Sequence, residues 1–205
     1  MAGILFIISA PSGSGKSTLV NQLRSLVGNL EFSISYTTRH SRGSEQQGRE
    51  YHFTDRATFE RMVAEDEFLE HAEVFGNYYG THTSALEAAE NNGKDLVLDI
   101  DVQGAGQLKG KLPEAVTIFV LAPSRQILEQ RLRARGEDAD AVVERRLRDA
   151  AQEIRNYCLY DYVVINSDLD KSAATLSAIV QAERVRRTRI EDQIRPILAT
   201  FQKEN

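Results

Sequence analysis

A glycine-rich segment near the N-terminus carries the residues whose chemistry is easiest to name. The run Ala10-Pro-Ser-Gly-Ser-Gly-Lys-Ser17 follows an apolar stretch. Gly13 and Gly15 permit a tight turn whose backbone N–H groups point inward at phosphate oxygens, and a following helix offers its positive N-terminal end. In such a loop Lys16 reaches the β- and γ-phosphates, and the Ser17 hydroxyl is a ligand for Mg²⁺. The segment therefore predicts binding of a nucleoside triphosphate.

The elements around this loop favour the same interpretation. An unspecialised turn between a strand and a helix is the alternative, since such turns also use Gly and Ser. Apolar residues recur at helical spacing after the loop, at Leu19, Val20 and Leu23, so the required strand and helix are both present. The usual pattern begins with Gly, and this chain has Ala10, which is tolerable where φ stays negative.

Length and composition limit the remaining possibilities. The chain has 205 residues and a net charge of −5, which fits one α/β domain with insertions and argues against sequence-blind nucleic-acid binding. A single cysteine, Cys158, excludes an internal disulfide, and its apolar helical surroundings predict a buried thiol. No apolar run is long enough to span a bilayer, and no basic segment precedes the first one. A cytoplasmic protein is expected, with its oligomeric state left open.

Four apolar runs are typical of buried parallel strands, and helical stretches alternate with them. These runs are 4–9, 96–101, 115–121 and 162–165. The alternation predicts a doubly wound α/β core. Two segments do not follow this alternation of strands and helices. One is polar and contains short alternating stretches, and the other is strongly helical and rich in arginine. The expected division is a core of 1–34, 85–123 and 158–205, a small mixed insertion at 35–84, and a helical lid at 124–157.

Acidic and basic side chains gather where ligands of such sheets bind, outside the carboxyl ends of the strands. Two-residue alternation places Asp99 and Asp101 on one face at the end of a strand, near the expected triphosphate. They could orient the water shell of Mg²⁺ or accept hydrogen bonds from a base or hydroxyl. In the lid, Arg131 and Arg135 stand at i,i+4, and Arg146 borders an apolar stripe. Such arginines fit transition-state clamps for phosphoryl transfer.

The insertion contains a second candidate anion site. Arg39, Arg42 and Tyr51 suit a phosphomonoester, because guanidinium groups bind phosphate in a bidentate manner. Two phosphate sites imply a donor and an acceptor. A carboxylate such as Glu70 accepts hydrogen bonds from N1–H and N2–H₂ of guanine, whereas adenine has no such donor pair; a solvated helix-end acid is the equal alternative for Glu70.

Taken together, these motifs resemble the guanylate kinase family over essentially the whole chain. The resemblance rests on the glycine-rich loop and on further segments spread along the sequence, which are 33–39 with Arg42, 50–53, 68–81, 98–104, 131–136 and 163–170. It implies a P-loop NTPase-type doubly wound parallel sheet with a small mixed α+β nucleotide-binding insertion and a helical lid. It also implies Mg²⁺-dependent transfer of the γ-phosphate of ATP to GMP, and to dGMP, giving ADP and GDP.

The resemblance assigns a role to each matching residue. The catalytic set is Lys16, Arg42, Arg135 and Arg146. The ATP-binding set is Ala10, Pro11, Ser12, Gly13, Ser14, Gly15, Lys16, Ser17, Thr18 and Asn166, with Ser17 on Mg²⁺ and Arg131 as a further phosphate contact. The GMP-binding set is Ser35, Arg39, Arg42, Tyr51, Glu70, Tyr79, Thr81, Asp99 and Asp101.

Two other classes of protein share parts of this pattern. A silent guanylate-kinase-like binding module tends to lose the loop and lid residues, yet Lys16, Arg42, Arg135 and Arg146 are all present. A P-loop kinase acting on a sugar phosphate would not need the guanine-reading set. The chain departs from the family at His82 and Ser167, which replace a more usual Ser and Asp.

Overall fold

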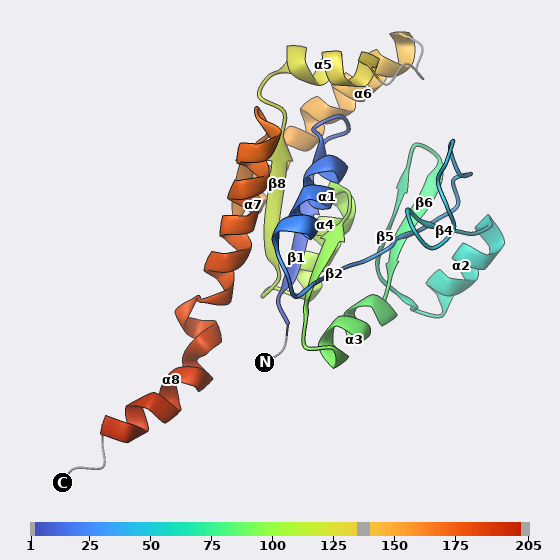
Figure 1. Ribbon diagram of the computed structural model, residues 1–205. Coiled ribbons are helices and arrows are strands. Elements are labelled where there is room, and N and C mark those ends of the chain that lie inside the picture. Colours follow the sequence, from blue (N-terminus) through green and yellow to red (C-terminus); the bar gives the residue numbers. More distant parts are fainter. Residues whose placement is uncertain (1–2, 135–139, 202–205) are drawn as a thin grey trace.

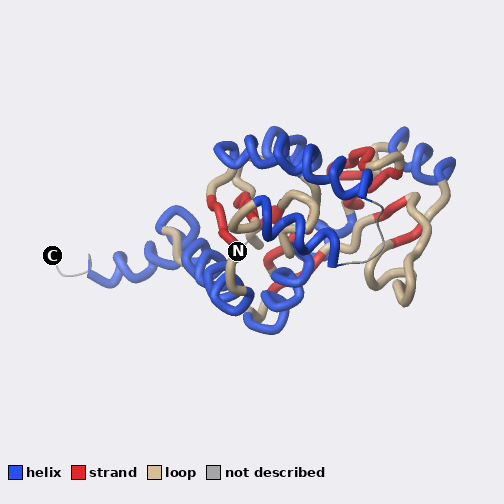
Figure 2. The backbone as a smooth tube through the Cα atoms, turned by 90° about the horizontal axis from the view of Figure 1, so that it is seen from above, coloured by secondary structure: helices blue, strands red, loops and turns tan. Residues whose placement is uncertain are grey.

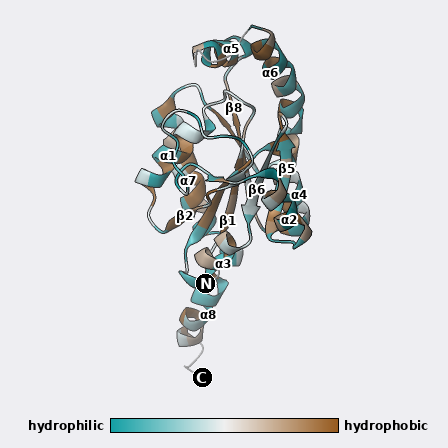
Figure 3. Cartoon of the chain, turned by 90° about the vertical axis from the view of Figure 1, so that its right-hand side faces the viewer, coloured by the Kyte–Doolittle hydropathy of each residue, from teal (hydrophilic) through white to brown (hydrophobic). Residues whose placement is uncertain are grey.

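The centre of the molecule is a parallel sheet built from the apolar runs of the sequence (Figure 1). The computed structural model describes residues 3–134 and 140–201. In spatial order the strands are β2 (Leu30–Phe32), β7 (Asp95–Asp99), β1 (Leu5–Ser9), β8 (Val116–Leu121) and β9 (Tyr162–Ile165), and every pair is parallel. Every residue of the central strand β1 is buried, as expected for a sheet covered on both faces. The hydropathy colours of Figure 3 show the strands of this sheet as hydrophobic.

Helices cover the two faces of this sheet. One face packs against α1 (Lys16–Leu26) and α7 (Leu169–Arg184) through apolar residues that include Leu19, Leu23 and Leu176. The other face packs against α3 (Ser84–Asn91) and α4 (Val102–Lys111). The predicted doubly wound α/β core is confirmed.

Two details differ from the sequence-based expectations. Strand β2 was not predicted, because it has three half-buried residues and no apolar run to reveal it. Cys158 is exposed, not buried. Helix α6 ends at Glu153, and the chain continues as the 3₁₀ helix η1 (Ile154–Leu159), so the apolar stripe of α6 does not reach the cysteine.

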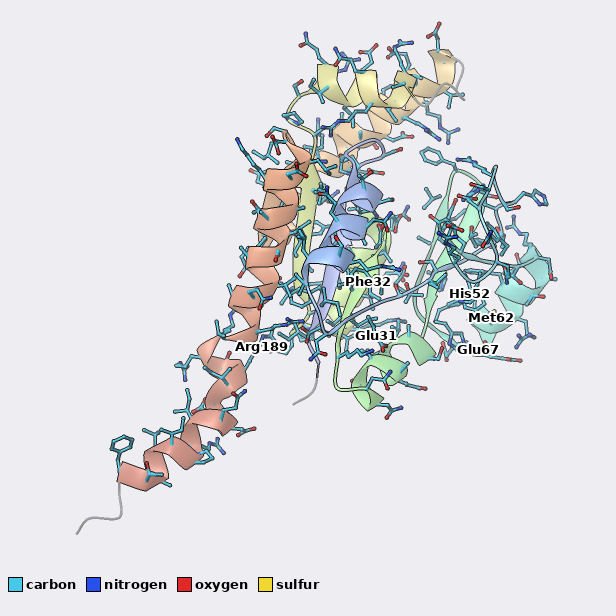
Figure 4. The ribbon with its side chains drawn as sticks, in the orientation of Figure 1. Glu31, Phe32, His52, Met62, Glu67 and Arg189 are labelled. Carbon is cyan, nitrogen blue, oxygen red and sulfur yellow. The ribbon has the colours of Figure 1, made fainter. Side chains whose placement is uncertain are left out.

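A second, mixed sheet lies beside the first (Figure 2). Its strands, in spatial order, are β4 (His52–Phe53), β3 (Tyr36–Thr37), β6 (Asn77–His82) and β5 (Phe68–Val74). Helix α2 (Arg56–Ala64) covers one face, where Phe59, Met62 and Phe68 form a separate small core (Figure 4). This apolar cluster gives the second sheet packing of its own, apart from the parallel sheet.

Two further helices lie above the ends of the parallel strands (Figures 1 and 3). They are α5 (Arg125–Ala134) and α6 (Asp140–Glu153), called here the lid helices. The backbone N–H of Ile127 donates to Ser124 Oγ at 3.2 Å, which caps the start of α5. Leu128 and Leu132 pack against Val143 and Leu147, so the pair has its own apolar contact.

The C-terminal helix α8 (Arg187–Phe201) extends away from the body, and none of its described residues is buried (Figure 1). Its first turn is fixed to the core by Arg189, which donates to the carbonyl oxygen of Glu114 at 3.3 Å and faces the buried Glu183 at 3.5 Å (Figure 4). Within the described ranges, no helix combines the length and apolar character that crossing a bilayer requires.

Candidate active site

The glycine-rich loop joins β1 to α1 in the conformation that its composition predicts. Gly13 and Gly15 both have φ of +88°, a left-handed conformation that side chains disfavour. Gly15 is the N-cap of α1, which begins at Lys16. A Cβ at Gly15 would lie 2.5 Å from Asn166 Nδ2, so the loop also needs glycine there for packing. The loop thus presents the positive end of a helix to the adjoining cavity.

Lys16 lies at the carboxyl end of the parallel strands. Its Nζ is 2.6 Å from Asp99 Oδ1 and donates to the carbonyl oxygen of Ile100 at 2.5 Å. Asp99 is the last residue of β7, whereas Asp101 lies beyond the strand and caps α4 by accepting from the Gly104 N–H at 2.9 Å. The prediction that one strand carries both acids is therefore wrong, because β7 ends before Asp101.

Asn166 and Arg131 support the loop from behind. Asn166 is buried, and its Nδ2 donates to the carbonyl oxygen of Ser14 at 2.9 Å. The Arg131 guanidinium donates to that same carbonyl at 3.2 Å and to the carbonyl oxygen of Asn166 at 2.9 Å. These contacts fix the loop's position relative to α5 and the end of β9.

The second sheet supplies a basic and aromatic cluster. The Arg39 guanidinium donates to both carboxylate oxygens of Glu45, at 3.0 and 2.9 Å, and lies 5.2 Å from the centroid of the Tyr51 ring. The Arg42 N–H donates to Glu45 at 2.8 Å. The hydrogen bond from Arg39 holds the pKa of Glu45 below its usual range, so this acid is a charged partner of the cluster. Tyr79 packs edge-on against Tyr51.

Glu70 is a buried acid at the inner side of the same sheet. The residue is 3% exposed, and its carboxyl group accepts a hydrogen bond from Thr81 Oγ1 at 2.7 Å. Burial raises the pKa of Glu70 to about 7, with a smaller contribution from the nearby charge of Asp101. Glu70 is therefore not a solvated helix-end acid. It is a buried carboxyl group on a strand of the second sheet.

Gly104 in α4 makes room for this carboxyl group. A Cβ at Gly104 would overlap Glu70 Oε2, whereas a Cβ at Gly106 in the same helix meets no described atom within 4 Å. The sequence alone did not identify Gly104 as a site residue, because the requirement for glycine at this position arises from a contact between α4 and β5.

Replacing Gly104 with alanine is therefore expected to displace Glu70 and to lower kcat/KM roughly tenfold for a substrate that this carboxyl group hydrogen-bonds, the worth of one hydrogen bond to a charged group. Gly106→Ala is the matched control and should keep turnover and stabilise α4. Steady-state kinetics and thermal melts of both variants test this. Equal kcat/KM in the two variants would contradict the assigned contact.

One cavity of about 620 Å³ brings most of the predicted residues together. The predicted residues that line it are Ala10, Pro11, Ser12, Gly13, Ser14, Gly15, Lys16, Ser17, Ser35, Arg39, Arg42, Tyr51, Glu70, Tyr79, Asp99, Asp101 and Arg146. In the described parts of the chain, four predicted residues do not line the cavity: Thr18, Thr81, Arg131 and Asn166. Three of them contact residues that do line it, because Thr81 donates a hydrogen bond to Glu70 and both Arg131 and Asn166 donate to the carbonyl oxygen of Ser14. Arg135 lies outside the described residues.

The cavity also has lining residues that sequence reasoning missed. These are Glu45, Val74, Phe75, Asn77, Ile100, Val142 and Arg145. Glu45 had a local signal, since an acid three residues after Arg42 can close a turn, and its N–H does donate to the Arg42 carbonyl at 3.0 Å. The contribution of Phe75 and Arg145 needs the second sheet and the lid helices to be placed side by side, which no local pattern provides.

Comparison with known proteins places the chain in a family. The family model for guanylate kinase matches residues 3–183. Guanylate kinase of Koribacter versatilis is 58% identical over 203 residues, covering 97% of this chain and 87% of the relative. That of Escherichia coli K12 is 45% identical over 189 residues, covering 91% of each. The crystal structure of guanylate kinase from Anaplasma phagocytophilum superposes with a TM-score of 0.78 at 36% identity, covering 92% of this chain and 89% of that one. The chain therefore belongs to the guanylate kinase family.

Proposed function

We propose that this enzyme transfers the γ-phosphate of ATP to GMP, giving ADP and GDP, and that it also accepts dGMP. The observation that carries the proposal is the single cavity that joins the glycine-rich loop, the arginine cluster of the second sheet and the buried Glu70. The loop suits a triphosphate and the cluster suits a phosphomonoester, so donor and acceptor phosphates would meet in one space. Cytoplasmic location is part of the proposal, because both substrates are nucleotides of general metabolism.

The proposed roles follow the position of each side chain. Ala10 to Thr18 bind the ATP phosphates, with Arg131 and Asn166 supporting the loop and the adenine side. Arg39, Arg42, Tyr51 and Tyr79 bind the phosphate of GMP. Ser35, Glu70 and Asp101 read guanine, with Thr81 acting through its hydrogen bond to Glu70; Asp99 belongs to the same GMP-binding set and also orients Lys16. Lys16, Arg42, Arg146 and Arg135 neutralise charge in the transition state. The corresponding functional parts are residues 35–84 for GMP, 124–157 for the lid, and the remainder for ATP.

The site fits Mg²⁺ bound through substrate phosphates. Mg²⁺ usually keeps several waters and takes few protein ligands, and the Ser17 hydroxyl lines the cavity at the loop. The described residues contain no group of three or more His, Cys, Asp or Glu side chains arranged to hold a metal ion on their own. When bound, Mg²⁺ would neutralise phosphate charge.

The chain's own residues mainly provide positioning and charge. Phosphoryl transfer requires the attacking and leaving oxygens to be in line and the charge on the equatorial oxygens to be stabilised. Lys16 and the arginines supply, from three directions, the positive charge that stabilises these oxygens. The acceptor oxygen belongs to an ionised phosphate, so the reaction requires no general base.

A panel of phosphate acceptors tests the function. With ATP and Mg²⁺, release of ADP is expected with GMP and dGMP, and turnover with AMP, CMP or a sugar phosphate is expected to be at least 100-fold lower in kcat/KM, since a site built to hydrogen-bond a base edge rejects analogues that lack the matching groups by roughly 10² or more. Chelation of Mg²⁺ should abolish turnover. Preference for AMP or a sugar phosphate over GMP would overturn the assignment.

A further inference from the structure

The tip of the β5–β6 hairpin reaches toward the lid helix α6 across the mouth of the cavity (Figures 1 and 3). Val74 and Asn77 are paired across the hairpin, so Phe75 and Gly76 form a two-residue loop. The Phe75 ring lies under two cations of α6, with its centroid 5.4 Å from Arg145 Cζ and 5.8 Å from Arg146 Cζ. All three side chains line the cavity. The hairpin tip is thus a direct contact between the second sheet and the lid.

Phe75 is also poorly suited to its backbone conformation. Its φ is +51° and that of Gly76 is +80°, which is the pattern of a type I′ turn. Asn-Gly is the preferred pair in such turns, and a bulky side chain at positive φ is strained. The residue is 46% exposed, so burial of its side chain offsets little of this strain. A strained residue that the local fold does not favour points to a role beyond folding.

We propose that Phe75 is a positioning residue that holds Arg145 and Arg146 over the cavity and thereby couples the GMP-binding sheet to the lid. The inference rests on the proposed function, since Arg146 is there a clamp on the transferring phosphoryl group. A guanidinium over an aromatic face is attracted by the ring quadrupole while its N–H edges stay available for phosphate oxygens. Movement of the second sheet toward GMP would carry the ring, and with it the α6 arginines, toward the reacting phosphates.

Phe75→Asn is the decisive variant because folding and positioning predict opposite effects. Asn-Gly relieves the left-handed strain, so Tm should rise by roughly 2–4 °C, the shift expected for about 1 kcal/mol in a chain of this size. Loss of the aromatic face should lower kcat for GMP phosphorylation roughly three- to tenfold, in line with one or two cation–π contacts. The KM for GMP should change less than twofold, because the Phe75 ring faces the lid arginines.

Two controls separate positioning from a general disturbance. Phe75→Tyr keeps the ring and should restore most of the kcat that Phe75→Asn loses. Asp66→Asn alters another left-handed residue, with φ of +53°, in the turn between α2 and β5, and should leave kcat unchanged.

A double-mutant cycle with Arg145→Met measures the coupling itself. If the ring acts through the arginines, the double variant should lose clearly less kcat than the product of the two single losses. Multiplicative losses, or a Phe75→Asn variant whose kcat is within twofold of the unchanged chain, would overturn the proposal. Failure of the unchanged chain to phosphorylate GMP would instead overturn the proposed function, so the two failures are distinguishable.

Discussion

Lys16→Ala is expected to lower kcat for phosphate transfer roughly 10³-fold, the upper range for removing one charge stabiliser from a preorganised site. Lys16 is the first residue of α1, and its Nζ is held at the cavity by Asp99 and Ile100. It thus already lies where a triphosphate on the loop would extend its terminal phosphates. Release of ADP at saturating ATP and GMP measures the effect.

Thermal stability distinguishes a loss of catalysis in Lys16→Ala from a loss of the folded structure. The ion pair of Lys16 with Asp99 is 19% and 29% exposed at its two side chains, so its removal should cost no more than about 1 kcal/mol. Lys94→Ala is the matched control, because it removes another lysine ion pair, with Glu31 at 3.1 Å, at the edge strand β2 (Figure 4). Both variants should melt within a few degrees of the unchanged chain. Near-normal turnover by Lys16→Ala would mean that the loop does not bind the donor.

Features encoded within a few consecutive residues were predictable from the sequence. Gly13, Gly15 and Lys16 form one continuous loop, and their types alone imply the left-handed turns and the helix start that the structure contains. The buried strands of the core were predictable for a similar reason, because strands covered on both faces are apolar along their whole length.

Features that depend on contacts between distant segments were not predictable. Gly104 is needed because α4 passes over Glu70, which lies on a strand of the second sheet. Phe75 meets Arg145 only because the second sheet and the lid helices lie side by side. Residue types suggested which side chains form the site. The neighbouring residues that hold those side chains in place could be identified only from the three-dimensional structure.

Glu70→Gln is expected to lower kcat/KM for GMP roughly 100-fold and to narrow the preference for GMP over AMP. A carboxylate accepts from both N1–H and N2–H₂ of guanine, and hydrogen bonds to a charged group contribute about 1.5–3 kcal/mol each. The amide of Gln offers one acceptor and one donor, so it loses a guanine bond and gains a partner for adenine N1. The ratio of kcat/KM values for the two nucleotides measures the change, and an unchanged ratio would move base recognition to another residue.

The pH dependence of GMP binding tests the same residue independently. Because burial raises the pKa of Glu70 to about 7, the group is largely protonated at pH 6, and GMP must displace that proton. The KM for GMP should therefore fall roughly tenfold between pH 6 and pH 8, following the ionised fraction. Burial also raises the pKa of Glu153, at the end of α6, to about 7, so the profile of Glu70→Gln is the required control. Parallel profiles for the two proteins would assign the titration to Glu153 or to the substrate phosphate.

Stability should respond to pH in the opposite sense. The raised pKa means that the folded protein keeps a proton on Glu70 between pH 4.5 and 7 after the unfolded chain has released it. The free energy of unfolding contributed by this group therefore falls as the pH rises through that window. Glu70→Gln removes the ionisable group and should be more stable than the unchanged chain at pH 8, with the advantage lost near pH 4.5. A variant that gains stability at pH 8 while losing selectivity for GMP would show that the carboxyl group is kept buried for base recognition and not for folding.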